Sequence, residues 1–229
     1  MQDAKFVSKA FSRIAGRYVL ANHVMSLGID WWWRRVVSQR AALHKPQRIL
    51  DLATGSGDLA AVLLKACPGA EVLGADFSLP MLRRAQARRL PALIAADALR
   101  LPLADASFDL VTVAFGLRNM ASWPEALREM RRVLKPDGHL MVLDFSLPSV
   151  SWLRRAYCWY LREVMPKIGG LITGQREAYE YLCTSIEAFP SGQDMVDLMR
   201  QCGLGPVEVR PLTAGVASLY EASVMARPE

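Results

Sequence analysis

The sequence predicts an α/β protein whose mostly parallel sheet is covered by helices on both faces. From about Arg48 onward, short runs rich in β-forming residues alternate with segments of helical periodicity. Several of these runs lack polar alternation, as expected for strands that are buried on both faces. With 229 residues, of which 52% are hydrophobic, the chain can bury one sizeable core, so we expect a single domain.

Seven runs are predicted to form strands. They span residues 48–53, 71–76, 92–96, 108–115, 139–145, 206–212 and 215–226. Only a few residues around Thr213, Ala214 and Gly215 separate the last two runs. That short connection predicts an antiparallel hairpin at one edge of the sheet.

Two of the intervening helices have clear ends. One is predicted over 58–66, directly after the first strand and its turn. The other has Ser122 as its N-cap and ends around 136–138, where Pro, Asp and Gly follow one another. Residues 1–47 and 146–203 fall outside the alternation, and we expect both to cover the carboxyl edge of the sheet.

Charge leaves several partner classes open. The net charge of +6 suits nucleic acid, an anionic membrane surface or simple solubility. Basic pairs such as Arg34-Arg35 and Arg154-Arg155 mostly fall on predicted helices, where a solvated face explains them. Because we find no aromatic and basic recognition module, we expect no nucleic-acid partner.

The cysteines and the N-terminal residues predict a cytoplasmic protein. The four cysteines show neither CxxC spacing nor a flanking histidine pattern, so we expect reduced thiols, no metal site and no disulfide framework. The N-terminal stretch carries an acid at Asp3 and no apolar core of signal-peptide length. No apolar run reaches the roughly 18 residues that a membrane span requires.

The turn after the first strand is the first candidate for a binding site. Ligands of open α/β sheets bind outside the carboxyl ends of the strands. Gly55 and Gly57 let this turn approach a ligand closely, and the helix that follows presents free N–H groups. Asp76 ends the next strand, where an acid can accept both hydroxyls of a ribose. Together these residues predict an adenosine-containing cofactor.

Two cofactor classes fit this pattern, a dinucleotide and S-adenosylmethionine (SAM). Dinucleotide sites usually have a third glycine where this chain has Ala60, although some accept alanine. Asp97, after the third strand, adds a carboxylate suited to the exocyclic amine of adenine. Several acids around a nucleoside that carries no phosphate favour SAM, which is cationic at sulfur. A helix N-cap is the alternative role for Asp76 and Asp97.

Four segments then resemble the successive motifs of class I methyltransferases: 51–60, 74–82, 96–119 and 127–146. The tetrapeptide Gly-Leu-Arg-Asn at 116–119 is particular to the UbiE/COQ5 family of quinone C-methyltransferases. Segments near both ends, 14–35 and 179–204, are also similar to that family, so the resemblance covers nearly the whole chain.

The resemblance implies a Rossmann-like, seven-stranded class I methyltransferase sheet with a C-terminal antiparallel hairpin and a helical cap. One domain would span 1–229, with an N-terminal helical cap (1–47), a cofactor-binding core (48–145), a helical insertion over the acceptor site (146–203) and an edge hairpin (204–229). The implied reaction is SAM-dependent methylation of a ring carbon of a polyprenylated quinol, either demethylmenaquinol or a benzoquinol, in menaquinone or ubiquinone biosynthesis.

The resemblance also assigns site residues. Arg118 and Asn119 are expected at the acceptor, where arginine can stabilise a developing phenolate; a salt bridge that fixes the loop is the alternative for Arg118. The general base is left open among Asp144, His23, Tyr18 and Tyr181. The expected cofactor contacts are Asp51, Thr54, Gly55, Ser56, Gly57, Asp76, Phe77, Asp97, Ala98 and Ala114.

The chain departs from the family pattern mainly on the acceptor side. The changed positions are Val19, Ala21, Asp30, Thr54, Asp144 and Tyr220, where the family has Asp, Met, His, Gly, Glu and His. Two alternatives therefore stay open. One is a methyltransferase with a different phenolic or isoprenoid acceptor, and the other is an inactive SAM-binding assembly subunit.

Two segments mix tryptophans with arginines, at 31–35 and 152–155. Amphipathic rings beside cations favour the interface of an anionic membrane, and core packing of the tryptophans is the alternative. The expected partners are thus a lipid-tailed quinol and the inner face of the membrane, bound peripherally. A homodimer is a further prediction.

Overall fold

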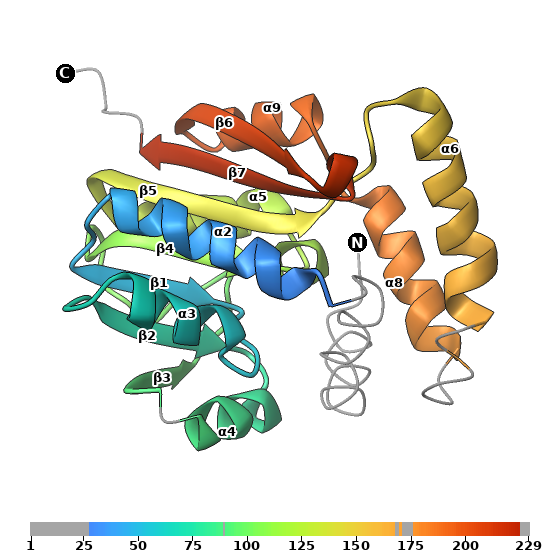
Figure 1. The fold of residues 1–229 in the computed structure, drawn as a ribbon. Helices are drawn as coiled ribbons and strands as arrows, with labels where there is room; N and C mark the ends of the chain where they lie inside the picture. The colour runs from blue at the N-terminus through green and yellow to red at the C-terminus, as the bar shows by residue number, and fades with distance from the viewer. Residues whose placement is uncertain (1–27, 89, 168–169, 171–175, 225–229) are drawn as a thin grey trace.

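The computed structural model describes residues 28–88, 90–167, 170 and 176–224. They form a seven-stranded sheet with helices on both faces and two long helices across one edge (Figure 1). The predicted α/β class is confirmed. Tyr18, Val19, Ala21 and His23 lie outside the described residues.

The strand order is β3-β2-β1-β4-β5-β7-β6. The first five strands along the chain are parallel, while β7 runs antiparallel to both β5 and β6. The predicted C-terminal hairpin is therefore confirmed at one edge of the sheet. The strands are β1 (Arg48–Leu52), β2 (Glu71–Asp76), β3 (Ala92–Ala95), β4 (Phe108–Ala114), β5 (Leu134–Phe145), β6 (Leu204–Leu212) and β7 (Ala217–Val224).

The helix before β5 is shorter than predicted. Ser122 caps α5 (Trp123–Val133) as expected, because its hydroxyl accepts a hydrogen bond from the backbone N–H of Glu125 at 3.4 Å. The helix ends at Val133 rather than around 136–138. Pro136 disfavours helical backbone at the residue before it, and Leu134 already pairs with Phe108 of β4.

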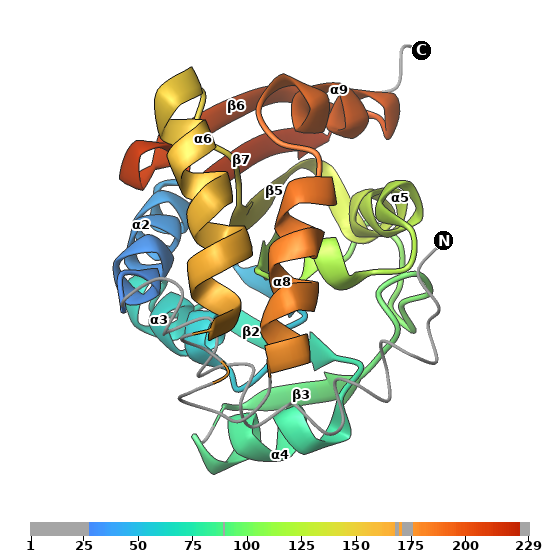
Figure 2. The same cartoon turned by 90° about the vertical axis from the view of Figure 1, so that its right-hand side faces the viewer.

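Helices flank the sheet on both sides (Figure 2). On one face, α2 (Asp30–Leu43) and α3 (Asp58–Ala66) bury an apolar cluster that includes Trp33 and Leu63. On the other face, α5 and α9 (Gln193–Gln201) bury a second cluster that includes Leu127 and Met199. Near the other edge of the sheet, α4 (Leu79–Ala87) packs beside β2 and β3.

The position of α9 corrects one boundary. Residues 193–201 were expected within the helical insertion over the acceptor site, yet α9 packs against β6 and α5. Its buried side chains, Met195, Val196 and Met199, lie along one stripe of the helix, and that stripe must be covered by the sheet. The insertion over the carboxyl edge is therefore shorter than 146–203.

Figure 2 views the carboxyl edge of the sheet, with two helical segments standing before it. We call the helical cap α6 (Ser151–Trp159), the π-helical turn η2 (Tyr160–Val164) and α8 (Arg176–Ala188). Two short 3-10 turns lie at the same edge: η1 (Leu117–Asn119) leads from β4 to α5, and η3 (Thr213–Gly215) connects β6 to β7. No helix in the described ranges is long and apolar enough to span a bilayer.

Candidate active site

The turn after β1 is built on left-handed backbone. Gly55 has φ +58° and Gly57 has φ +79°, a region that side chains rarely adopt. A Cβ atom on Gly57 would also lie 2.3 Å from a methyl group of Leu90. The turn closes when the Gly57 N–H donates to the carbonyl of Thr54 at 2.9 Å, and α3 starts at the next residue. Its free N–H groups therefore face the carboxyl edge of the sheet.

Asp51 supports this turn from below. Its two carboxylate oxygens accept hydrogen bonds from the hydroxyls of Thr54 at 2.6 Å and Thr112 at 2.8 Å. Burial raises the pKa of Asp51 to about 6, against the effect of these two hydrogen bonds. Thr54, which replaces the glycine usual in the family pattern, thus joins the turn to β1 and β4.

Asp76 connects the turn to the end of β2. Its carboxylate accepts hydrogen bonds from the backbone N–H groups of Gly55 and Ser78, both at 2.8 Å. Burial raises the pKa of Asp76, and the two N–H donors limit the rise. The following ring, that of Phe77, is exposed at this edge.

Asp97 lies close to Asp76 because β2 and β3 are neighbours, and the N–H of Ala96 donates to the Asp76 carbonyl at 3.1 Å. The Asp97 side chain is exposed and accepts a hydrogen bond from the N–H of Leu99 at 2.9 Å. Ala98 and Ala114 are half-buried beside it and at the end of β4, respectively. The carboxylates after β2 and β3 therefore share one edge.

Asp58, at the start of α3, adds another acid next to the glycine turn. The hydroxyl of Ser56 donates to it at 2.5 Å, and Arg88 pairs with it at the same distance. Burial opposes ionisation of Asp58, but the Ser56 hydrogen bond and the charges of Arg34 and Arg88 lower its pKa overall. An ionised carboxylate therefore borders the turn.

Arg118 and Asp144 form a completely buried ion pair. Both side chains are 0% exposed, and the Arg118 guanidinium bonds the Asp144 carboxylate and the carbonyl of Phe115. The guanidinium carbon also lies 5.2 Å from the ring centroid of Phe145. Burial raises the pKa of Asp144 although Arg118 opposes the rise. The side-chain amide of Asn119 donates to the Phe115 carbonyl at 3.3 Å, so this pair and this amide fix the loop after β4.

An apolar cluster lies between this loop and the helical cap. The rings of Phe115 and Phe145 are 4.8 Å apart, and Trp33 of α2 packs within 6 Å of both. The cap contributes further apolar side chains to the same cluster, among them Tyr179 and Cys183. We call this cluster, with Tyr157 packed against it, the aromatic cluster. Burial raises the pKa of the Tyr157 phenol, so this phenol is not suited to act as a base.

Some residues singled out in the sequence have structural roles. Tyr220 belongs to the apolar cluster on the α5 face, and its hydroxyl accepts a hydrogen bond from the N–H of Gly192 at 2.8 Å. It therefore lies away from the aromatic cluster. Outside the site, at the amino ends of the strands, the rings of His44 and His139 stack with centroids 3.8 Å apart. Tyr181 of α8 is half-buried in the cap.

The sequence did not single out Arg34 as part of the site. It was interpreted as half of a basic pair on a solvated helix face, but Arg34 is only 9% exposed and forms an ion pair with Asp30. Its guanidinium carbon lies 5.3 Å from the ring centroid of Phe115. The spacing of Asp30 and Arg34, one helical turn apart, is the one signal in the sequence that indicates this pair.

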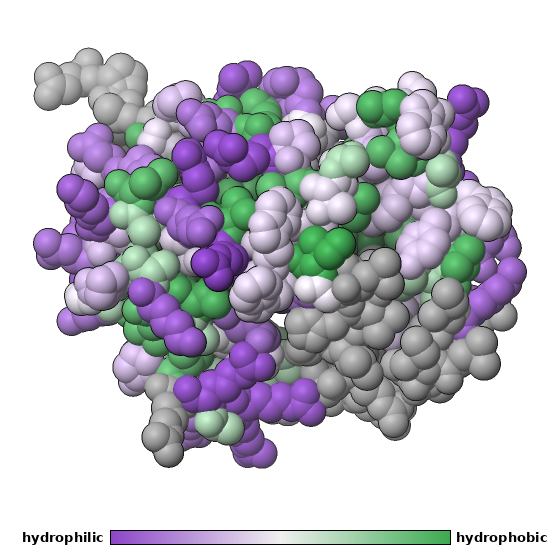
Figure 3. Space-filling model, in the orientation of Figure 1, coloured by the Kyte–Doolittle hydropathy of each residue, from purple (hydrophilic) through white to green (hydrophobic). Residues whose placement is uncertain are grey.

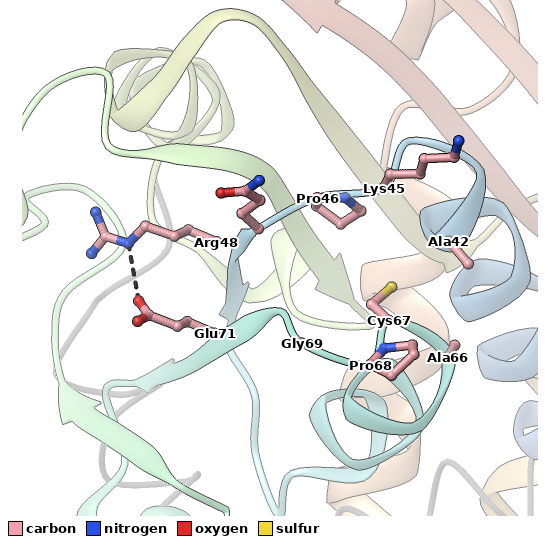
Figure 4. Close-up of a pocket in the computed structure, with 10 residues that line it drawn as sticks. Ala42, Lys45, Pro46, Arg48, Ala66, Cys67, Pro68, Gly69 and Glu71 are labelled. Atoms are coloured by element: carbon pink, nitrogen blue, oxygen red, sulfur yellow. Dashed lines mark ion pairs between the residues drawn. The ribbon is translucent and has the colours of Figure 1, made fainter.

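A hollow of about 520 Å³ lies at the opposite, amino-terminal edge (Figure 4). It is lined by the starts of β1 and β2 and the end of α3, with Arg48 and Glu71 paired at 3.4 Å. None of the residues described for the carboxyl edge lines this hollow. The site at the carboxyl edge is thus separate from this hollow.

Comparisons with known proteins identify the family. A profile of the UbiE/COQ5 methyltransferase family matches residues 1–223. The chain belongs to the UbiE/COQ5 methyltransferase family. A demethylmenaquinone methyltransferase of Thermus thermophilus is 47% identical over 92% of this chain and 97% of its own length. The ubiquinone/menaquinone biosynthesis C-methyltransferase UbiE of Syntrophotalea carbinolica is 46% identical over 92% of this chain and 90% of its own length.

Solved structures support the fold. A SAM-dependent methyltransferase from Thermotoga maritima, described as a possible histamine N-methyltransferase, has a TM-score of 0.60. It covers 94% of this chain and 98% of its own at 19% identity. A putative methyltransferase of Haloferax volcanii, solved with the activator Trm112, has a TM-score of 0.63 at 16% identity, covering 90% and 96% of the two chains. The predicted class I methyltransferase fold is therefore confirmed.

The residues at the carboxyl edge fit the methyl donor of this UbiE/COQ5 protein. Asp76 and Asp97 have carboxylate oxygens suited to a ribose and an adenine, and the start of α3, directly after the glycine turn, presents free N–H groups. The surrounding acids would repel phosphates but suit a cation. The protein is a SAM-dependent methyltransferase, and SAM is its cofactor.

Proposed function

We propose that this enzyme methylates a ring carbon of demethylmenaquinol, with the corresponding polyprenylated benzoquinol as the second acceptor of the same class. The observation that carries this proposal is the loop at 116–119, which directly follows Phe115 of the aromatic cluster and packs against Ala53 of the turn after β1. The relatives named above act, by their names, on quinone precursors. An apolar, aromatic surrounding beside the methyl donor suits a prenylated ring.

The reaction needs a nucleophilic ring carbon in line with the methyl group. A phenolic hydroxyl that has lost its proton makes the neighbouring ring carbon nucleophilic. A carbon–carbon bond to the methyl group then forms as the carbon–sulfur bond breaks, S-adenosylhomocysteine leaves and the ring loses a proton. The protein contributes by holding both molecules together without water, which can be worth about 7–11 kcal/mol.

On the cofactor side, we assign Asp76 to the ribose hydroxyls and Asp97 with Ala98 to the adenine. Phe77 and Ala114 border the same space. The glycine turn, with Thr54 and Ser56, holds the part of the molecule near sulfur. Asp51 is almost completely buried under the turn, so its role in this proposal is to keep the turn in place.

On the acceptor side, Arg118 acts through its charge. The buried guanidinium opposes the rise in the Tyr157 pKa that burial causes, so its positive charge acts on the space under α6. The same charge would stabilise a phenolate. We assign Asn119 to the same loop and Asp144 to the positioning of Arg118, because Asp144 has no exposed surface for a substrate.

We further propose that the helical cap rests on the inner face of the membrane. Four of the six tryptophans are between 46% and 66% exposed, and all four lie on α2 or α6. Figure 3 shows pale and green residues among purple, hydrophilic ones over these helices. Arg154 and Arg155 are exposed on α6. Exposed indoles beside cations suit an anionic interface.

Labelled methyl transfer tests the proposed acceptor. The purified protein is incubated with methyl-labelled SAM and short-tailed, chemically reduced demethylmenaquinol or benzoquinol, and the products are analysed by mass spectrometry. We expect ring-methylated product from demethylmenaquinol. Binding of S-adenosylhomocysteine without transfer to either quinol would refute the proposed acceptor. The predicted homodimer stays a prediction.

A further inference from the structure

Arg34 is a buried cation at the carboxyl edge of the sheet. It lies in the first turns of α2, whose N-terminal end points to this edge (Figure 1). One guanidinium nitrogen bonds the fully buried carboxylate of Asp30, and the plane lies near the ring of Phe115. The side chain keeps 11% of its surface exposed. Because a guanidinium has five N–H donors, the bond to Asp30 leaves donors for a further anion.

The sheet order sets the direction of the cofactor. With adenine at Asp97 after β3 and ribose at Asp76 after β2, the rest of the molecule must continue across β1 toward β4. Neighbouring strands are about 4.8 Å apart, so the amino acid end of SAM reaches the space above the glycine turn. That space is bordered by the end of β4, where Phe115 lies.

The charges in that space match an amino acid. Asp51 and Asp58 flank the glycine turn. Burial raises the pKa of Asp51 and the Arg34 charge opposes that rise, while the same charge contributes to the lowered pKa of Asp58. Arg88 also reaches Asp58, but its side chain is 46% exposed and already paired there. Among these groups, Arg34 is the buried cation, while the acids suit an ammonium group.

We propose that Arg34, held in place by Asp30, binds the carboxylate of the amino acid end of SAM. Asp30 is one of the positions at which the sequence departs from the pattern it resembles, and in the structure it is the carboxylate that pairs with Arg34. The ion pair holds a long side chain near the ring of Phe115, at the end of β4. The inference rests on the methyl donor and not on the quinol of the proposed function.

Calorimetric titration with two ligands tests this assignment. S-adenosylhomocysteine carries the carboxylate, and its decarboxylated analogue, S-adenosyl-3-thiopropylamine, lacks it. In Arg34→Met we expect the affinity for S-adenosylhomocysteine to fall about 10- to 100-fold, the size of one charge-assisted interaction. The affinity for the decarboxylated analogue should change less than about threefold.

Two further variants control for folding and for charge. Arg35→Met removes an exposed cation from the same helix and should leave both affinities unchanged. The double variant Asp30→Asn with Arg34→Met removes both charges of the pair. It should distinguish the two ligands as poorly as Arg34→Met does. If the two variants that lack Arg34 lose affinity equally for S-adenosylhomocysteine and for the decarboxylated analogue, the proposal is wrong. A wild-type protein that binds S-adenosylhomocysteine but methylates no quinol would refute only the proposed acceptor.

Discussion

At the scale of single residues, we expect the largest change in unfolding free energy from substitutions in the buried ion pair of Arg118 and Asp144. Asp144→Asn removes the carboxylate charge that pairs with the fully buried guanidinium of Arg118, and breaking such a buried pair typically costs about 3–5 kcal/mol of unfolding free energy. The double variant Arg118→Met with Asp144→Leu removes both charges and should be clearly more stable than Asp144→Asn. Urea denaturation of the three proteins measures these differences.

The same double variant separates stability from chemistry. If the Arg118 charge stabilises the phenolate, turnover should fall strongly while affinity for S-adenosylhomocysteine stays nearly unchanged. Glu187→Gln, which breaks the exposed pair with Arg162, is the matched control and should alter neither property. Full turnover in the double variant would show that the pair only fixes the loop.

The sequence indicated which residues end strands, but not how deeply each is buried. Asp76 and Asp97 could be predicted at one edge because their strands end there. The full burial of Asp51 could not, since it depends on the hydroxyl of Thr112, which approaches only when β4 pairs with β1. For the same reason, the sequence did not show that Arg34 and Arg118 are buried. The side chains that enclose a buried arginine come from distant parts of the chain.

At the scale of elements, the turns after β1 and β4 meet without room for a side chain. A Cβ atom on Gly116 would lie 2.5 Å from the Cβ of Ala53, so this glycine permits the close approach of the two loops. Gly116→Ala should therefore lower the unfolding free energy by about 1–3 kcal/mol and weaken binding of S-adenosylhomocysteine.

Rescue by a second change checks that explanation. Ala53 has φ +53°, which glycine adopts readily, so Ala53→Gly removes the clashing Cβ atom without strain. The double variant should recover most of the stability and affinity lost in Gly116→Ala, as measured by thermal unfolding and calorimetry. If the double variant is as unstable and binds S-adenosylhomocysteine as weakly as Gly116→Ala, this contact has no steric role.

Secondary structure was predicted best where local signals decide it. The helix at Asp58–Ala66 and the strand at Glu71–Asp76 have the predicted bounds. The end of α5 and the start of β5 differ because Leu134 takes its extended conformation from pairing with β4. The place of α9 could not be predicted either. The apolar stripe of α9 predicts that this helix packs against another element, but it does not indicate that β6 and α5 are the elements.

At the scale of the whole molecule, the chemistry and the exposed tryptophans share one side. The helical cap covers the carboxyl edge where the cofactor residues lie (Figure 2), and α6 carries exposed Trp152 and Trp159. No residue of α6 itself is buried. A helix that is amphipathic but only partly covered suits a second apolar surface, and a membrane would bring a lipid-tailed quinol directly to the cap.

Vesicle co-sedimentation tests this arrangement. We expect the wild-type protein to bind vesicles that contain anionic lipid. Arg154→Gln with Arg155→Gln should weaken binding to these vesicles by about 2 kcal/mol, at about 1 kcal/mol for each cation near the surface, and leave binding to neutral vesicles unchanged. Trp152→Ser with Trp159→Ser should weaken binding to anionic and to neutral vesicles alike, because it removes apolar surface area. Leu43→Ser, an exposed apolar residue at the far end of α2, is the control.

Turnover distinguishes membrane docking from catalysis in the same variants. If α6 docks the enzyme where the quinol resides, Trp152→Ser with Trp159→Ser should methylate a short-tailed quinol at the wild-type rate but a long-tailed quinol in vesicles much more slowly. If the variant methylates neither the short-tailed nor the long-tailed quinol, the two tryptophans support the fold or the acceptor site instead. Wild-type protein that stays entirely in the supernatant of anionic vesicles would exclude the membrane role, and the exposed indoles would then need a protein partner.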